Sequence, residues 1–246
     1  MGSLTDSLRK MKTTYEDAIL KGRYTELIRS KVLIEILHDF AVQELTKKLP
    51  ADWVYRDKPA YGFPKTKTQD ILVQPPQDPA KSLSVGPLLT VNVRSQLSSI
   101  DKNFDTLFER LFAEALNLHN RFPYLVLGYL YLLPKIGYSD SSAAERKVEF
   151  KERYNVAKYI QSFLSITDRK GPNDVPWRYE RICLLIVDFQ KDPPAVLNDT
   201  RVFMREGLVS KDFASHFSFA TLSMGKFFDE LYRIAMERYY SLLTSS

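Results

Sequence analysis

Cysteine and histidine are scarce in this chain, whose 246 residues include one cysteine and three histidines. Cys183 lies in an apolar run, so we expect a buried core residue. It cannot form a disulfide framework, and it has no spacing to His38, His119 or His216 that would suit zinc. His38 and His119 fall in predicted helices, where we expect structural roles. With no disulfide framework, we expect a reducing, cytoplasmic compartment.

Glycine is also sparse, with nine residues, and no glycine-rich phosphate loop or G-x-S-x-G motif occurs. Nucleotide-binding and serine-hydrolase sites of those kinds are therefore excluded. No apolar run reaches the roughly 18 residues of a membrane-spanning helix, and the N-terminus lacks the apolar core of a signal peptide. We expect no membrane partner.

Aromatic residues are abundant, with 14 Tyr, 15 Phe and 2 Trp, and the net charge is +5. This length and composition allow one large domain with a substantial core. The mild basic excess permits a polyanionic partner such as nucleic acid without requiring one.

The stretch Leu88 to Pro134 organises the rest of the chain. It predicts a strand over Leu88–Val93, an amphipathic helix from an Asp101 N-cap to about Asn120, and a strand over Tyr124–Leu133. The other expected helices are Leu4–Leu20, Tyr24–Leu45, Phe150–Leu164, Val196–Met204 and Lys226–Leu243; the other strands are Trp53–Tyr55, Ile71–Val73 and Tyr179–Phe189; and Arg56–Lys67, Gln74–Pro87, Ile136–Glu149 and Thr167–Trp177 are expected loops.

This order predicts an α/β fold, with a mixed central sheet flanked by helices. We expect one domain over residues 1–246, with a core at about 24–134 and a C-terminal strand and helices over 150–246.

Two glutamates on the expected central helix point in different directions. Glu114 lies three residues after Leu111 on the apolar face, whereas Glu109 is about 140° further round at about 100° per residue. Helical phase therefore favours Glu114 as the inward carboxylate.

Zinc sites, glycine-rich nucleotide-binding sites and serine-hydrolase sites are excluded above. The remaining chemistry is a carboxylate site for a hard cation such as Mg²⁺, completed by substrate phosphate. The segment TQDILV places Asp70 at the head of a strand, and the next strand ends Asn92-Val93-Arg94-Ser95-Gln96, followed by a polar tail and a helix. This arrangement resembles the PD-(D/E)XK core of type II restriction endonucleases. The resemblance implies a restriction-endonuclease-like core with Asp70 as a metal ligand, although Asn92 and Arg94 replace the family's second acid and lysine.

In one branch of that family the second acid sits on the following helix, and the segment Glu114 to Leu118 is similar to that branch. The resemblance implies Asp70 and Glu114 as ligands of Mg²⁺, or Mn²⁺, with Asn92 as a weaker carbonyl ligand. Arg94 and Gln96 would lie at the cleaved phosphate. Glu26 is the better match to the family's first-helix glutamate, with Glu35 as the alternative.

Arg94 stays protonated near neutral pH, so it can orient a phosphate but cannot act as a base. Basic and polar residues near these strands are candidates for contact with DNA. They are Lys58, Lys65, Lys67, Ser98, Ser99, Lys102 and Asn103.

Two functional hypotheses follow. The first is a sequence-specific, Mg²⁺-dependent endonuclease of double-stranded DNA, acting as a homodimer with Lys226–Leu243 as a candidate interface. The second is a nuclease-fold protein without catalysis that binds DNA or a protein partner. A third, purely structural interpretation makes Asp70 a turn residue and Glu114 a core glutamate paired with Arg94.

Overall fold

The computed structural model describes residues 3–76 and 86–244, and the side chains of Asn103 and residues 241–244 lie outside that description. Within these ranges, six strands form one sheet in the order β1-β2-β3-β4-β7-β8. These strands are β1 (Val54–Tyr61), β2 (Thr66–Val73), β3 (Leu89–Ser95), β4 (Val126–Pro134), β7 (Arg181–Asp188) and β8 (Ala195–Leu197).

The sheet is mixed. β1, β2 and β3 are antiparallel neighbours, β3, β4 and β7 run parallel, and β8 closes the far edge antiparallel to β7. Helix α4 (Phe104–Arg121) makes the crossover between the parallel strands β3 and β4. The predicted α/β fold with a mixed, helix-flanked sheet is confirmed.

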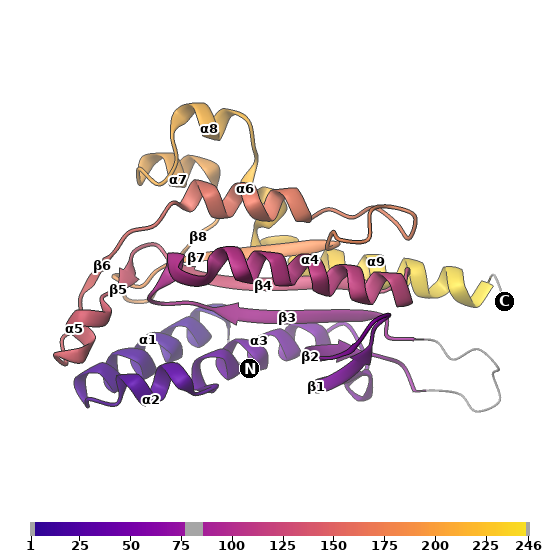
Figure 1. Cartoon of the computed structure of the whole chain (residues 1–246), viewed down its shortest axis with the longest axis horizontal. Helices are drawn as coiled ribbons and strands as arrows, with labels where there is room; N and C mark the ends of the chain where they lie inside the picture. The colour runs from indigo at the N-terminus through magenta and orange to yellow at the C-terminus, as the bar shows by residue number, and fades with distance from the viewer. Residues whose placement is uncertain (1–2, 77–85, 245–246) are drawn as a thin grey trace.

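Helices cover both faces of the sheet. One core contains side chains of α1 (Leu4–Leu20), α3 (Val32–Thr46) and α9 (Phe227–Thr244), packed on residues such as Val91 and Val93. The other core contains side chains of α4 and α6 (Val156–Ile166), packed on residues such as Tyr129 and Tyr131. Figure 1 shows α1 and α3 on one side of β3 and α6 on the other.

The central strands follow the predicted pattern. β4 and β7 are buried along almost their whole length, because helices cover both of their faces. Cys183 is fully buried in β7, as expected. Among residues 3–76 and 86–244, no helix combines the length and apolar character that crossing a bilayer requires.

The predicted loop over Arg56–Lys67 is wrong, because most of it forms the β1–β2 hairpin. β1 is polar and contains Pro59, and these features led to the prediction of a loop. They are tolerated because β1 is an edge strand with only one paired side. Residues 77–85, which belong to the predicted Gln74–Pro87 connection, lie outside the described residues.

The helix predicted over Tyr24–Leu45 is two helices, α2 (Tyr24–Arg29) and α3, separated at Ser30. Ser30 is extended, and its hydroxyl donates to the carbonyl of Leu27, which ends α2. Asp101 is not an N-cap, because a 3₁₀ turn η2 (Ile100–Asn103) precedes α4.

Two other segments differ from their predictions because short strands and caps interrupt them. Phe150 begins β6 (Phe150–Glu152), and Asn155 then caps α6. The expected helix from Val196 divides into β8 and α7 (Thr200–Arg205), capped by Asp199. The remaining elements are η1 (Ala51–Trp53), β5 (Gly137–Tyr138), α5 (Asp140–Ala144), α8 (Lys211–Ser215), η3 (Phe219–Leu222) and η4 (Met224–Lys226).

Candidate active site

The candidate site lies where β2 separates from β3. The two strands pair only over Ile71–Val73 and Leu89–Val91, whereas β2 continues with β1 to the hairpin end at Thr66. The part of β2 that precedes Ile71 lies against α4, where Lys67 contacts Glu114. The separation leaves a cavity of about 210 Å³ between β2, β3 and α4.

Asp70 and Asn92 hold the two strands together at the point of separation. The Asp70 N–H donates to Asn92 Oδ1 at 2.9 Å, and the Val93 N–H donates to Asp70 Oδ2 at 2.8 Å. Side-chain oxygens thus replace the backbone carbonyls that would accept these bonds in a regular ladder. Alternation along β2 and β3 places Asp70, Asn92 and Arg94 on the face covered by α4.

Asn92 is oriented by three groups. Its Oδ1 accepts the Asp70 N–H, and its Nδ2 donates to Gln69 Oε1 at 2.9 Å and to Glu114 Oε1. If the amide were flipped, its NH₂ group would face the Asp70 N–H and its oxygen would face the oxygens of Gln69 and Glu114. The hydrogen bonds therefore fix the orientation of the amide. Asn92 therefore bridges the Asp70 backbone and the Glu114 carboxylate, while its role as a carbonyl ligand stays a prediction.

Glu114 comes from α4 and is 6% exposed, which confirms that it is the inward glutamate, whereas Glu109 is exposed. One carboxylate oxygen accepts from Asn92 and the other forms an ion pair with the Lys67 ammonium. The partner of Glu114 is therefore Lys67, and not the Arg94 of the structural interpretation. Lys67, predicted as a DNA contact, lies in the candidate site itself.

Behind Asp70 lies the buried side chain of His38, whose Nε2 is 3.6 Å from Asp70 Oδ2. Its other nitrogen is 3.9 Å from Glu35, which also pairs with Arg56. Burial acts to raise the pKa of Asp70, but His38, the Val93 N–H and the charge of Arg94 outweigh it and lower that pKa. Asp70 is therefore an ionised carboxylate at neutral pH.

Of the two first-helix glutamates considered, the structure brings Glu35 close to the site. Glu35 lies on α3 beside His38, which contacts Asp70. Glu26 is exposed on α2 and lines a different cavity with Thr14 and Asp17. The break at Ser30 separates the two helices that carry these glutamates.

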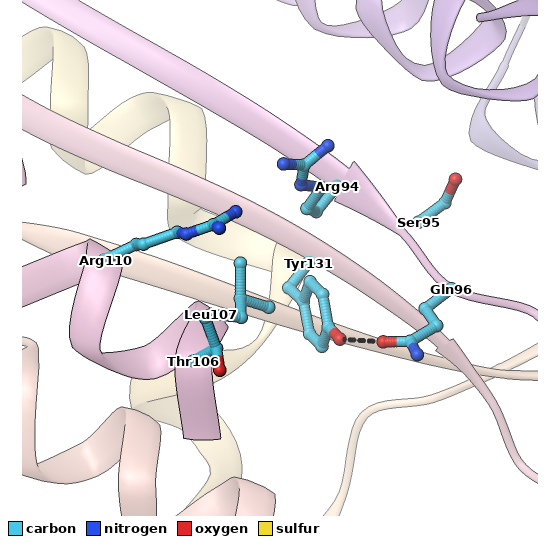
Figure 2. Close-up of a pocket in the computed structure, with 7 residues that line it drawn as sticks. All are labelled: Arg94, Ser95, Gln96, Thr106, Leu107, Arg110 and Tyr131. Atoms are coloured by element: carbon cyan, nitrogen blue, oxygen red, sulfur yellow. Dashed lines mark hydrogen bonds between the residues drawn. The ribbon is translucent and has the colours of Figure 1, made fainter. Parts of the chain in front are cut away.

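A second cavity, of about 420 Å³, adjoins the first, and Arg94, Leu107 and Arg110 line both. Figure 2 shows the side chains of Arg94, from β3, and Arg110, from α4, on either side of this cavity. Neither arginine forms an ion pair with any residue of the described ranges, and both are exposed. Two unpaired guanidinium groups beside two carboxylates form a site suited to a phosphate oxygen.

Gln96 borders this second cavity, as predicted for a residue near the substrate. Its Oε1 accepts from the Tyr131 hydroxyl at 2.7 Å, and its Nε2 donates to the Ser99 carbonyl at 2.6 Å (Figure 2 shows the first bond). Both ends of the amide are thereby held by protein groups.

The predicted DNA contacts after β3 lie away from the carboxylates. Ser98 bonds to the Tyr24 hydroxyl at 2.9 Å, Ser99 donates to Asp140, and the Lys102 ammonium donates to the Ser99 hydroxyl at 3.2 Å. The side chain of Asn103 lies outside the described residues. Lys58 and Lys65 lie on the β1–β2 hairpin.

No protein-family model, no curated protein and no solved structure matches this chain.

A divalent cation would bind at this site only under two conditions. In the described ranges, no group of three or more His, Cys, Asp and Glu side chains is arranged to hold a metal ion. Asp70 and Glu114 are two carboxylates on one cavity, which is the usual protein contribution to a Mg²⁺ site. Water and substrate phosphate must complete the shell, and Lys67 must release Glu114.

Sequence reasoning did not find Arg110, His38 or Lys67 as members of this site. Arg110 lies four residues before Glu114 on α4, so its helical phase could have placed it on the same face. The roles of His38 and Lys67 depend on contacts between distant segments, and no local pattern marks them.

Proposed function

We propose that this protein is a Mg²⁺-dependent endonuclease that cuts double-stranded DNA at specific sequences. The observation that carries the proposal is that Asp70, Glu114 and Arg94 line one cavity although they come from β2, α4 and β3. These are the residues that the resemblance to restriction endonucleases singles out. A two-fold symmetric dimer would present one such site to each strand, so the proposal includes a homodimer.

In this proposal Asp70 and Glu114 hold Mg²⁺, which supplies Lewis-acid activation of the phosphate and of the attacking water when bound. Arg94 and Arg110 bind non-bridging phosphate oxygens and stabilise the charge that develops on them. Water forms a bond to phosphorus while the bond to the leaving oxygen breaks. Because Arg94 cannot accept the water proton, that proton passes to a phosphate oxygen or to solvent.

One observation favours a second candidate, a DNA-binding protein that does not cut. The Lys67 ammonium already pairs with the buried Glu114, which is the charge that a metal ion would otherwise neutralise. Under this candidate, the cations of the cavity bind a phosphate and no bond is broken. Incubation of supercoiled plasmid with the protein and Mg²⁺ separates the two candidates, with EDTA as the control.

Competition between Lys67 and the metal gives a further prediction. Replacing Lys67 by alanine is expected to tighten Mn²⁺ binding about tenfold, because it leaves the inward-facing Glu114 without its cation. Isothermal titration calorimetry at pH 8 measures this change. Lys58→Ala is the matched control, since Lys58 lies over the Tyr55 ring and does not contact Glu114. An unchanged Mn²⁺ affinity in Lys67→Ala would count against Glu114 as a ligand.

The arginine pair gives a prediction about salt. Arg94→Ala and Arg110→Ala are each expected to reduce the slope of log affinity for DNA against log salt concentration by about 0.9, the contribution of one phosphate contact. Fluorescence anisotropy with a labelled duplex at several salt concentrations measures the slope. Arg9→Ala on α1, where Arg9 pairs with Asp6 at 3.5 Å, is expected to leave it unchanged. Equal slopes in all the proteins would show that this arginine pair does not bind phosphate.

A further inference from the structure

The turn of the β1–β2 hairpin, residues 61–65, exposes two aromatic side chains. We call this segment the hairpin tip. Tyr61 is 68% exposed and Phe63 is 72% exposed, the two highest values among the large hydrophobic side chains of the described ranges. Exposed aromatic residues that gather at one place commonly mark an interaction surface.

The hairpin tip is held rigidly against α4. The Phe63 N–H donates to the Asn117 carbonyl at 2.9 Å, the Lys65 N–H donates to Asn117 Oδ1 at 3.2 Å, and Asn117 Nδ2 donates to the Lys65 carbonyl at 2.9 Å. A Cβ atom on Gly62 would lie 2.2 Å from the Asn117 side chain, so glycine permits this close approach. The turn is thus fixed by its backbone, while its aromatic side chains project into solvent.

The charge around the hairpin tip is positive. Three charged residues of the hairpin have partners of opposite charge. Arg56 pairs with Glu35 and Asp39, Asp57 pairs with Lys31, and Lys67 pairs with Glu114. Lys58 and Lys65 form no ion pair with any residue in the described part of the chain. Because Lys58 lies over the ring of Tyr55, six residues before Tyr61 on β1, Lys65 is the cation next to the two exposed aromatic rings. This combination suits a polyanion that also presents flat bases.

The hairpin tip also lies next to the candidate active site. Asn117, which anchors the tip, follows Glu114 by three residues on α4, a rise of about 4.5 Å at 1.5 Å per residue. Lys67, two residues beyond the tip, reaches Glu114 directly. A duplex whose phosphate entered the cavity would therefore pass beside Tyr61 and Phe63.

We infer that the hairpin tip is a DNA-binding surface, on which Phe63 and Tyr61 stack against bases next to the phosphate held in the cavity. This inference rests on the proposed function, because it takes the ligand of the cavity to be DNA. Lys65 contacts the backbone, and Asn117 positions the tip before DNA binds. Because every base has a π face, the stacking adds affinity and distorts the local duplex without selecting a sequence.

The test compares full-length variants by anisotropy on a labelled duplex. Phe63→Ala is expected to weaken DNA binding about tenfold, the loss typical of one stacked base, with an unchanged salt slope. Lys65→Gln is expected to lower the salt slope by about 0.9. Leu20→Ala, which removes a 57% exposed side chain from α1, is the matched control and should bind like the wild type. The melting temperatures of all three should match the wild type, because each side chain is exposed.

A fluorescence measurement reports stacking directly. Emission of Phe63→Trp is expected to be quenched when duplex DNA is added, whereas emission of Leu20→Trp is not. If wild type binds DNA but Phe63→Ala stays within twofold of it and Phe63→Trp is not quenched, the inference is overturned even if DNA is cut. If Phe63→Trp emission is quenched by DNA but the wild type never cuts DNA, the hairpin tip is supported as a DNA-binding surface. The endonuclease proposal is then overturned instead. Loss of a dimer in Phe63→Ala with unchanged DNA affinity would make the tip a protein interface and overturn the inference.

Discussion

Asp70→Asn is expected to abolish DNA cleavage, with a rate loss of about 10³-fold or more, while DNA still binds. The variant removes one of the two carboxylate charges that hold the metal in the proposed mechanism, a contribution of several kcal/mol to the transition state. Its side-chain oxygen still accepts the Val93 N–H that joins β3 to Asp70. The fold should therefore survive, and a lost negative charge does not weaken attraction to phosphate.

Cleavage is measured on supercoiled plasmid in Mg²⁺, and DNA affinity is measured by anisotropy in the absence of metal. Asp39→Asn is the matched control, because Asp39 is an exposed carboxylate of the neighbouring helix α3 that pairs with Arg56 at 2.6 Å. It should cut DNA like the wild type. Cleavage by Asp70→Asn within tenfold of the wild-type rate would remove Asp70 from the mechanism.

Glu180→Gln is expected to give the largest loss of stability, about 3–5 kcal/mol in the free energy of unfolding. Glu180 is fully buried, and its Oε1 accepts from Arg169 at 2.9 Å and from Arg238 at 2.7 Å, while its Oε2 accepts from the Leu127 N–H at 2.7 Å. The substitution leaves two buried guanidinium groups without a carboxylate. Urea denaturation measures the loss, and Glu145→Gln, an exposed partner of Lys147, should change stability by less than about 1 kcal/mol.

The same carboxylate makes stability depend on pH. Burial acts to raise the pKa of Glu180, but His119, Arg238 and the Leu127 N–H outweigh burial and hold that pKa at about 2, below the ordinary 4.5. Its contribution to stability is therefore complete above pH 4.5 and is lost as pH falls from 4.5 through about 2. Glu180→Gln should lose less stability than the wild type across that window. Parallel pH curves for the two proteins would contradict this role.

The periodicity of apolar residues predicted the central strands and the main amphipathic helix. The apolar runs of β3, β4 and β7 and the phase of α4 identified the central sheet and the inward position of Glu114, because burial on both faces or on one helical face leaves a clear periodicity. Only the start of the edge strand β1 was predicted, within Trp53–Tyr55. The rest escaped prediction, since an edge strand pairs on one side only and its sequence can be polar and contain Pro59.

The candidate site was predictable only in part, because its geometry depends on where β2 leaves β3. Asp70, Asn92 and Arg94 share a face through simple strand alternation. The pairing of Lys67 with Glu114 and the position of His38 behind Asp70 arise from the hairpin crossing to α4 and from the packing of α3. Glu35, and not Glu26, lies beside His38 because it precedes His38 by three residues on α3, whereas the break at Ser30 leaves Glu26 on the separate helix α2.

The most direct test of the endonuclease proposal is incubation of the wild-type protein with supercoiled plasmid and unmethylated phage DNA, in Mg²⁺ and then in Mn²⁺, with the products separated on a gel. The proposal predicts discrete fragments that appear with either ion and disappear in EDTA. DNA that stays intact with both ions, while anisotropy shows salt-dependent binding, would contradict cleavage and favour the DNA-binding protein that does not cut.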